Sequence, residues 1–392
     1  MGDLSIFQAT VPARWSRQNP NYREAPRALF HLRDTATLQE VETSIDRAYT
    51  SGVPFFTKRA IQHVWDQIKR NPAPGSPILF KDITGTPVAC KVQTGHVEFW
   101  RRPDGSKLQY VYKEIILGYD CRASLRDHLA NHVASGFRPQ TYAPCPIYLQ
   151  HVASELDIET KQITRGPAPL NREVTERSME DKTQRWIKSP ACDKLKAILS
   201  SSVKDHEINK IVAFSLGSPS KQWANDRGLE VFVQIIRVRS EFQHGLLKTL
   251  LEWLQGRGDK DQVRCYTQDP LYTEVDKQIL GESGIEVIGD PRGWLEADER
   301  SVLFTVAPTV PVKEIIADIT RPAVIIWDRV GFNDSLGNGN PNPDPDSPRV
   351  RQMMEGYECY EFGPHPKLFC NIVVYVRKSV AAPVPGEDGR FT

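Results

Sequence analysis

Three serines lie directly after a short apolar run that the sequence predicts to be a buried strand. The run is Lys210–Phe214, and the segment that follows it contains Ser215, Ser218 and Ser220. Where a strand ends and a helix begins, hydroxyls and backbone N–H groups converge, which suits an anion or an activated serine. Ser and Pro also favour helix starts for local reasons. On residue types alone, an ordinary capping turn is therefore the stronger interpretation.

A carboxylate and a phenol follow the next apolar run, 263–267. They are Asp269 and Tyr272, with Glu274 two residues further on. Asp269 could hold a guanidinium or ammonium group by charge-assisted hydrogen bonds. Asp before Pro is equally an ordinary turn former. Asp328, which follows the apolar run 323–327, has the same two interpretations.

The segment 210–330 is predicted to form the sheet and helices that position these side chains. Short apolar, β-branched runs alternate with segments whose apolar residues recur at helical spacing, which is typical of a parallel sheet. The predicted strands are 210–214, 263–267, 285–288, 302–306 and 323–327, and the predicted helices are 229–254, 273–280 and 312–319. In such sheets ligands bind beyond the carboxyl ends of the strands. The sequence therefore predicts an α/β, Rossmann-like, mostly parallel sheet with the candidate site at that edge.

The other segments are predicted to form attachments to this sheet. We expect an irregular arm at 1–30, an N-terminal α+β region at 31–170, and a sheet domain at 171–392 with a Pro/Asp-rich insertion at 331–350. Residue periodicity predicts further helices at 37–49, 58–69, 124–134 and 179–199, and strands at 78–92, 96–116 and 369–376. The polar stretch 160–176, which contains two prolines, is the predicted domain boundary.

Composition narrows the classes of protein. Of 392 residues, 40% are hydrophobic and 25% are charged, as in soluble globular proteins. The net charge of +1 means that contact with nucleic acid would require a local basic patch. Seven widely spaced cysteines favour reduced thiols. No apolar run is long enough to span a bilayer and no secretory signal is evident, so we expect a cytoplasmic protein with no membrane anchor.

Motifs for cofactors and metals are missing or incomplete in this sequence. It contains no dinucleotide fingerprint, phosphate-binding loop or nucleophile elbow, so we expect no cofactor. His128 and His132 lie four residues apart on a predicted helix, but no third ligand is evident and we expect no metal. The run 338–346 resembles a calcium loop only in composition. Basic residues near aromatic ones at 58–70, 100–102 and 172–188 could follow a phosphate backbone or form solvated helix faces.

Four landmarks resemble the sensitivity-to-red-light-reduced (SRR-like) domain family. They are Phe214–Ser220, Tyr266–Thr273, Leu280–Ile288 and Leu303–Pro308, and the resemblance covers roughly residues 205–330. Many members carry Pro-His-Cys-Pro where this chain has Pro308-Thr309-Val310-Pro311. A metal or haem role through that His and Cys is therefore not implied here. Most members are known as regulatory proteins without assigned chemistry.

The long N-terminal half and the Pro/Asp-rich insertion also resemble, in layout, the fungal arginine-containing cyclodipeptide synthases. Those enzymes take arginine and a second amino acid from aminoacyl-tRNAs and join them into a diketopiperazine. This resemblance implies arginyl-tRNA and a second aminoacyl-tRNA as partners. Because aminoacyl esters are already activated, no ATP motif is needed. A non-catalytic regulatory protein of the SRR-like family is the alternative.

The resemblance also implies roles for the candidate residues. Bacterial enzymes of the same activity carry a serine just past the first strand of a Rossmann-like sheet, and Ser218 is similar in position. Ser218, or else Ser215 or Ser220, would accept the first aminoacyl group, and Tyr272 would assist proton transfer. Asp269 or Asp328, with Glu274 beside the former, would hold the arginine side chain. Backbone N–H groups of the turn would stabilise the oxyanion. The second amino acid and the oligomeric state stay open.

Overall fold

The protein is described from a computed structural model. The described residues are 37–101, 107–138, 142–160, 162–163, 168–204, 206–222, 230–257, 263–331 and 342–378. The predicted arm at 1–30 and part of the predicted insertion at 331–350 lie outside these ranges.

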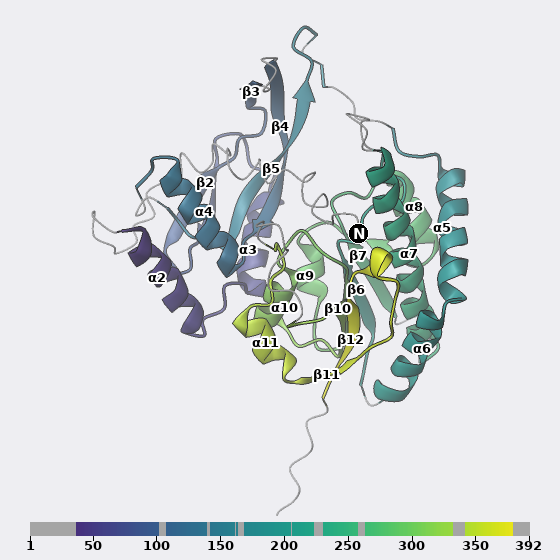
Figure 1. Ribbon diagram of the computed structural model, residues 1–392. Helices are drawn as coiled ribbons and strands as arrows, with labels where there is room; N and C mark the ends of the chain where they lie inside the picture. Colours follow the sequence, from purple (N-terminus) through teal and green to yellow (C-terminus); the bar gives the residue numbers. More distant parts are fainter. Residues whose placement is uncertain are drawn as a thin grey trace, which may run out of the picture.

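A seven-stranded, mostly parallel sheet forms the centre of the molecule (Figure 1), in the order β11-β12-β10-β9-β6-β7-β8. Its five parallel strands are β6 (Lys210–Phe214), β7 (Arg264–Gln268), β8 (Glu286–Val287), β9 (Ser301–Thr305) and β10 (Val324–Asp328). Two antiparallel strands extend one edge, namely β12 (Ile372–Arg377) and β11 (Tyr357–Tyr360). The α/β fold class and all five predicted parallel strands are confirmed.

The strand order reverses between β6 and β9. From β6 the chain moves outward to β7 and β8, and it then returns to the other side of β6 to form β9 and β10. Such a switch point opens a crevice at the carboxyl ends of the two central strands. Both ends have unusual backbone, because Ser215 after β6 has φ 57° and Ala307 after β9 has φ 45°. Left-handed φ is uncommon for residues with a side chain and marks sites where the surrounding structure holds the backbone.

Helices cover both faces of the sheet, as Figure 1 shows. One face packs against α5 (Arg172–Ile187), α6 (Pro190–Ser202), α7 (Glu230–Gln255) and α8 (Glu274–Glu282). The other packs against α9 (Arg292–Glu296), α10 (Val312–Ile319) and α11 (Pro348–Met354). The central strands are mostly apolar because successive side chains enter opposite cores. In β6, Ile211 and Ala213 face the α7 side, while Val212 and Phe214 face α9.

The N-terminal region contributes to the hydrophobic core on the face of the sheet that α9, α10 and α11 cover. It contains α2 (Leu38–Thr50), α3 (Lys58–Ile68), α4 (Arg122–Ala134), the hairpin β1 (Pro77–Lys81) with β2 (Pro87–Lys91), and the antiparallel sheet of β3 (Val97–Arg101), β4 (Lys107–Tyr119) and β5 (Ile147–Leu156). Its buried residues Ile45, Phe56 and Leu125 belong to the same hydrophobic cluster as Trp294 and Ile316 of the sheet domain. One continuous core therefore joins the two regions.

Some element predictions were wrong or incomplete. The single helix predicted at 179–199 is two helices, α5 and α6, because Ser189 caps the second one and Pro190 occupies its first turn. The strand β5 was not predicted, and neither were β11, α9, α11 and the short helix α12 (Pro366–Phe369). All but β5 are short, with too few residues to show a period.

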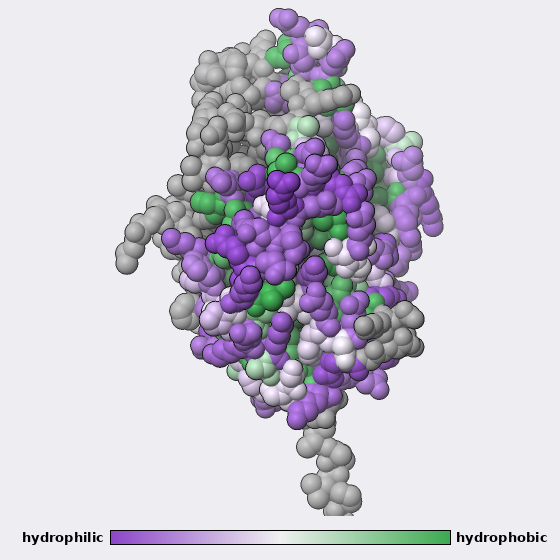
Figure 2. All heavy atoms as spheres, turned by 90° about the vertical axis from the view of Figure 1, so that its right-hand side faces the viewer, coloured by the Kyte–Doolittle hydropathy of each residue, from purple (hydrophilic) through white to green (hydrophobic). Residues whose placement is uncertain are grey.

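The face covered by α5 and its neighbours is largely hydrophilic, and its hydrophobic residues are scattered over it in small areas (Figure 2). Within the described ranges, no helix combines the length and the apolar character that crossing a bilayer requires.

Candidate functional site at the carboxyl edge of the sheet

Ser218 lies in the turn after β6 and its hydroxyl donates a hydrogen bond to Asp276 of α8. The same oxygen accepts the backbone N–H of Lys221 at 2.9 Å. Ser218 is 5% exposed and Asp276 is fully buried. A hydroxyl that donates to a buried carboxylate is the arrangement that a general base uses to activate a nucleophile.

The Asp276 carboxylate is also part of the start of α8. It accepts the backbone N–H of Thr273 at 2.8 Å, and the Thr273 hydroxyl accepts the N–H of Asp276 at 3.3 Å, which makes a capping box. The carboxylate further accepts the N–H of Ser220 at 3.0 Å. The turn after β6 is thus fastened to the first turn of α8 through one side chain.

The other two candidate serines differ in their surroundings. Ser220 is fully buried, and its hydroxyl lies 2.5 Å from the Thr273 hydroxyl. Ser215 is half-buried, and its backbone N–H donates to the carbonyl of Gln268 on β7. Of the three, Ser218 is therefore the serine whose hydroxyl is bonded to a carboxylate.

Asp269 connects the turns after β6 and β7. Its two carboxylate oxygens accept the backbone N–H groups of Gly217 and Leu271, each at 2.8 Å. Burial raises the pKa of Asp269 above its ordinary value, and the two backbone N–H donors act against this rise. The predicted arginine-binding carboxylate is thus already bonded to the backbone on both oxygens.

Three backbone N–H groups of the turn after β6 also have hydrogen-bond acceptors within the protein. Those of Gly217, Ser220 and Lys221 donate to Asp269, Asp276 and Ser218 respectively. The predicted oxyanion site would therefore require these bonds to rearrange when a substrate binds.

Tyr272 forms a buried chain of hydrogen bonds with His244 of α7. Its hydroxyl lies 2.8 Å from His244 Nε2 and 2.8 Å from the hydroxyl of Thr267. The other ring nitrogen, Nδ1, lies 2.7 Å from the carbonyl of Ser240. Because a carbonyl only accepts, Nδ1 carries the hydrogen, and Nε2 accepts the hydrogen bond from the phenol.

Burial fixes the protonation states of this chain. It lowers the pKa of His244 and raises the pKa of Tyr272 well above 10, so both groups are neutral near pH 7. The phenol was expected to assist proton transfer at the serines. Instead its hydrogen bonds run to His244 and Thr267, so any influence on Ser218 is indirect.

Asp328 lies apart from this cluster, whereas Glu274 stands in the first turn of α8 but is bonded elsewhere. Asp328 ends β10, three strands from β7 and hence roughly 14 Å away at the usual strand spacing. Its carboxylate accepts the N–H of Asn371 at 3.1 Å, and burial raises its pKa. Glu274 is exposed and pairs with Lys277 at 2.5 Å. The structure therefore does not bring the predicted substrate-binding carboxylates into one pocket.

Part of the predicted insertion folds back onto the same edge, near β10. Asp344 accepts the backbone N–H of Lys313 at 2.8 Å, and Asp346 pairs with the Lys313 ammonium at 2.6 Å. All three side chains are buried. Burial raises the pKa of Asp344 to about 7. This acidic run therefore anchors the start of α10 with its own carboxylates.

The two histidines that share a helix face each contact a neighbouring side chain. His128 Nδ1 lies 2.8 Å from the Asp120 carboxylate, and His132 stacks on Phe137. No group of three or more side chains suited to a metal occurs in the described part of the chain.

Some of the basic and aromatic residues singled out in the sequence make contacts within the fold. Trp186 is buried and donates to Thr249, Arg172 pairs with Glu176 and Glu282, and Lys58 donates to backbone carbonyls of the α9 segment. Arg102 lies outside the described residues. The charges of Lys58 and Arg172 are therefore already bonded to groups of the protein itself.

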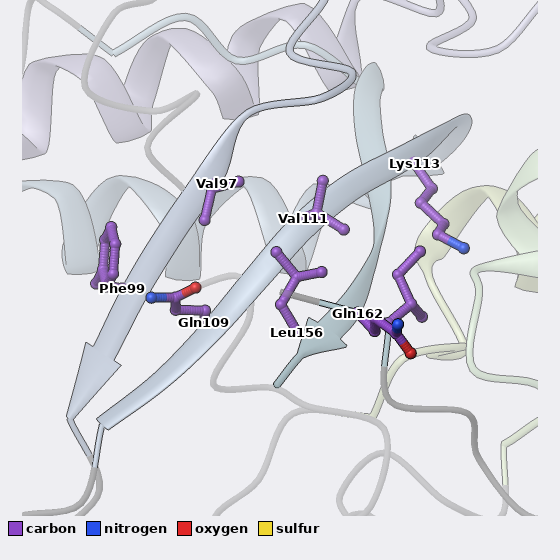
Figure 3. A pocket seen from close by; sticks show the side chains of 8 residues that line it. Val97, Phe99, Gln109, Val111, Lys113, Leu156 and Gln162 are labelled. Atoms are coloured by element: carbon purple, nitrogen blue, oxygen red, sulfur yellow. The ribbon is translucent and has the colours of Figure 1, made fainter. Parts of the chain in front are cut away.

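A groove lies elsewhere, on the three-stranded sheet β3-β4-β5. It has a volume of about 950 Å³ and is lined mainly by apolar side chains such as Val97, Phe99, Val111 and Leu156, which project from neighbouring strands in Figure 3. Among the described residues that line it, Lys113 is the charged one, and none of them forms a pair suited to acid–base chemistry.

Sequence reasoning missed Asp276, His244 and Thr267. Asp276 had a detectable signal, since it stands three residues after Thr273, as a capping box requires. His244 had none, because a His within a long amphipathic helix does not show which element its ring faces.

Comparison with protein families gives one match. Residues 191–352 match the model of the SRR1 domain, which covers all five parallel strands and the candidate site. A comparison with curated proteins found no match.

Proposed function

Starting from the similarity of residues 191–352 to the SRR1 domain, we propose that the protein is an aminoacyl transferase. It takes arginine and a second amino acid from aminoacyl-tRNAs and joins them into a diketopiperazine. The observation that carries the proposal is the hydrogen bond from Ser218 to the buried carboxylate of Asp276, at the carboxyl edge beside the switch point.

In the first step, the Ser218 oxygen attacks the ester carbonyl of the aminoacyl-tRNA while Asp276 takes the hydroxyl proton. The tetrahedral intermediate then breaks its bond to the ribose oxygen of the tRNA, which receives the proton. The products are an aminoacyl ester on Ser218 and free tRNA. Ester exchange of this kind needs neither ATP nor an oxidant.

In the later steps, the α-amino groups are the nucleophiles. The amine of one aminoacyl group attacks the ester carbonyl of the other, whose C–O bond breaks, and the released alcohol oxygen takes the proton lost by the amine. The resulting dipeptide is still held by the remaining ester. The second amine then attacks that remaining ester, which closes the six-membered ring and releases the last alcohol oxygen. Each step replaces an ester by an amide.

Access to Ser218 sets a requirement on this mechanism. Because Ser218 is 5% exposed and its oxygen accepts the N–H of Lys221, the turn after β6 must open when the tRNA end binds. The neutral Tyr272–His244 chain supports Thr267 and the end of β7 behind this turn, which makes it a positioning element.

The test is the intact mass of the purified protein after incubation with arginyl-tRNA. The wild type should gain one arginyl group, and Ser218→Ala should gain none. Ser215→Ala is the matched control and should still be modified. Equal modification of wild type and Ser218→Ala would exclude Ser218 as the acceptor.

A non-catalytic regulatory role is the second candidate, and one observation favours it. The Ser218–Asp276 bond belongs to a capping network in which the carboxylate also accepts two backbone N–H groups. If this network is only structural, no mass change will occur with any aminoacyl-tRNA, although the protein is folded.

A further inference from the structure

A cationic pocket lies at the edge of the sheet opposite the candidate site. Its volume is about 650 Å³. It is formed by the loop at 52–54, the ends of α10 and α11, and the end of β12, and its charged lining residues are Asp318, Arg321, Arg349, Arg377 and Lys378. Arg321 precedes β10 and Arg377 ends the antiparallel β12, which places both at the amino edge of the parallel strands.

Among the described lining residues, one cation and one carboxylate neutralise each other. Arg349 binds both oxygens of Asp318 at 2.9 and 3.1 Å, and the two side chains are 13% and 4% exposed. Asp318 also accepts the backbone N–H groups of Phe55 and Phe56. This carboxylate is therefore fully used and does not balance the other cations.

The three remaining cations are held in place by backbone carbonyls. Arg321 donates to the carbonyls of Ala317 and Thr320 at 2.7 and 2.8 Å. Arg377 donates to the carbonyl of Arg321. Lys378 donates to the carbonyl of Glu355 at 2.8 Å. A guanidinium has five N–H donors, and these bonds use one nitrogen of each arginine. Further donors stay available in fixed positions.

Helix ends offset part of this positive charge. The pocket adjoins the C-terminal ends of α10 and α11, and each such end contributes about half a negative charge. Among the described residues that line the pocket, this leaves about two net positive charges. Glu299, which accepts a hydrogen bond from Thr320 at 3.4 Å, does not line the pocket.

We infer that this pocket binds a phosphate group. Fixed guanidinium groups match phosphate oxygens in geometry and charge, and the volume falls in the range of ligand-binding pockets. The inference does not depend on the proposed transferase activity. The phosphate could belong to a free phosphorylated small molecule or to the backbone of an RNA, and the two sources are distinguished by the choice of probe.

The test measures binding to the full-length protein at low salt with two probes. Inorganic pyrophosphate is titrated by calorimetry, and a short fluorescent RNA by anisotropy. The variants are Arg321→Gln with Arg377→Gln, and Lys378→Gln alone. The matched control is Lys194→Gln with Lys196→Gln, which removes two exposed charges from α6 on the other side of the sheet.

The affinity of at least one probe should fall at least tenfold in the arginine double variant and several-fold in Lys378→Gln, with no change in the control. Loss for both probes indicates a small phosphorylated ligand, and loss for RNA alone indicates a nucleic-acid backbone. If the double variant fails to fold, the affinity of Lys378→Gln tests the inference, because Lys378 is exposed and its replacement should leave the fold intact. Equal affinities in all variants, or no binding of either probe by the wild type, would overturn the inference.

Discussion

Ser218 and Asp276 share a hydrogen bond that serves the fold and, in the proposed mechanism, the chemistry. Ser218→Ala removes one donor to a carboxylate that keeps two backbone donors, so we expect a loss of about 1 kcal/mol in the free energy of unfolding. Asp276→Asn turns an acceptor into a group with its own donors beside backbone N–H groups, so about 2 to 3 kcal/mol should be lost. Urea unfolding measures both. An Asp276→Asn variant as stable as the wild type would contradict the network.

Glu314 gives a pH-dependent prediction at the same scale. Burial raises the pKa of this fully buried residue from 4.5 to about 7, with Asp318 adding to the rise. The folded state therefore holds a proton that the unfolded state releases above pH 4.5, and stability falls as the pH rises from there through 7. At about 1.4 kcal/mol per pKa unit, the cost at pH 8 is about 3 kcal/mol.

Glu314→Gln should remove this cost, since the amide has no charge to bury. The variant is expected to unfold at a higher urea concentration than the wild type at pH 8 and at nearly the same concentration at pH 5. A difference that is equal at both pH values would show that the Glu314 carboxyl is not protonated in the folded state.

At the scale of elements, α5 and α7 pack closely at a glycine of α7. A Cβ at Gly245 of α7 would lie 3.1 Å from the backbone Cα of Thr183. Gly245→Ala should therefore cost about 1 to 3 kcal/mol. Gly281 of α8 has no atom within 4 Å of such a Cβ, so Gly281→Ala should stabilise the protein by about 0.5 to 1 kcal/mol. Thermal unfolding of the pair measures the contrast, and shifts in the same direction would refute the packing argument.

The elements also show what residue patterns can predict. The parallel strands were predictable because most contain a short run of apolar or β-branched residues next to a polar turn, as β6 illustrates. The break between α5 and α6 was missed although Ser189 and Pro190 mark it, because apolar spacing continues across it. The side-chain partners of Tyr272 were not predictable, since its bond to His244 depends on how α7 crosses the sheet.

At the scale of the whole molecule, Arg349 joins the N-terminal region to the sheet domain. It binds Asp318 and donates to the carbonyls of Tyr49 and Val53 at 2.5 and 2.7 Å. Arg349→Met would leave Asp318 buried without a cation and should cost about 3 to 5 kcal/mol. The exposed pair Arg300–Glu207 is the matched control, and Arg300→Met should change stability by less than about 1 kcal/mol.

Because one core spans both regions, the wild type should unfold in a single calorimetric transition. Two separate transitions, or an Arg349→Met variant as stable as Arg300→Met, would show that the two regions are energetically independent.

The location of the candidate site was predictable from the sequence, because the carboxyl ends of parallel strands meet at one edge. Which side chains make up the site was only partly predictable. Ser218 and Asp269 lie at that edge as expected, whereas Asp328 follows a strand placed roughly 14 Å from β7. Strand order decides which loops are neighbours, and residue patterns do not contain that order.

The most direct measurement of the transferase proposal is mass spectrometry of a bacterial host that expresses the protein. We predict new arginine-containing diketopiperazines with the wild type and with Ser215→Ala, and none with Ser218→Ala or Asp276→Asn at equal levels of soluble protein. Wild-type protein that is soluble and folded but yields no such product would contradict the account, as would a Ser218→Ala variant that yields as much product as the wild type.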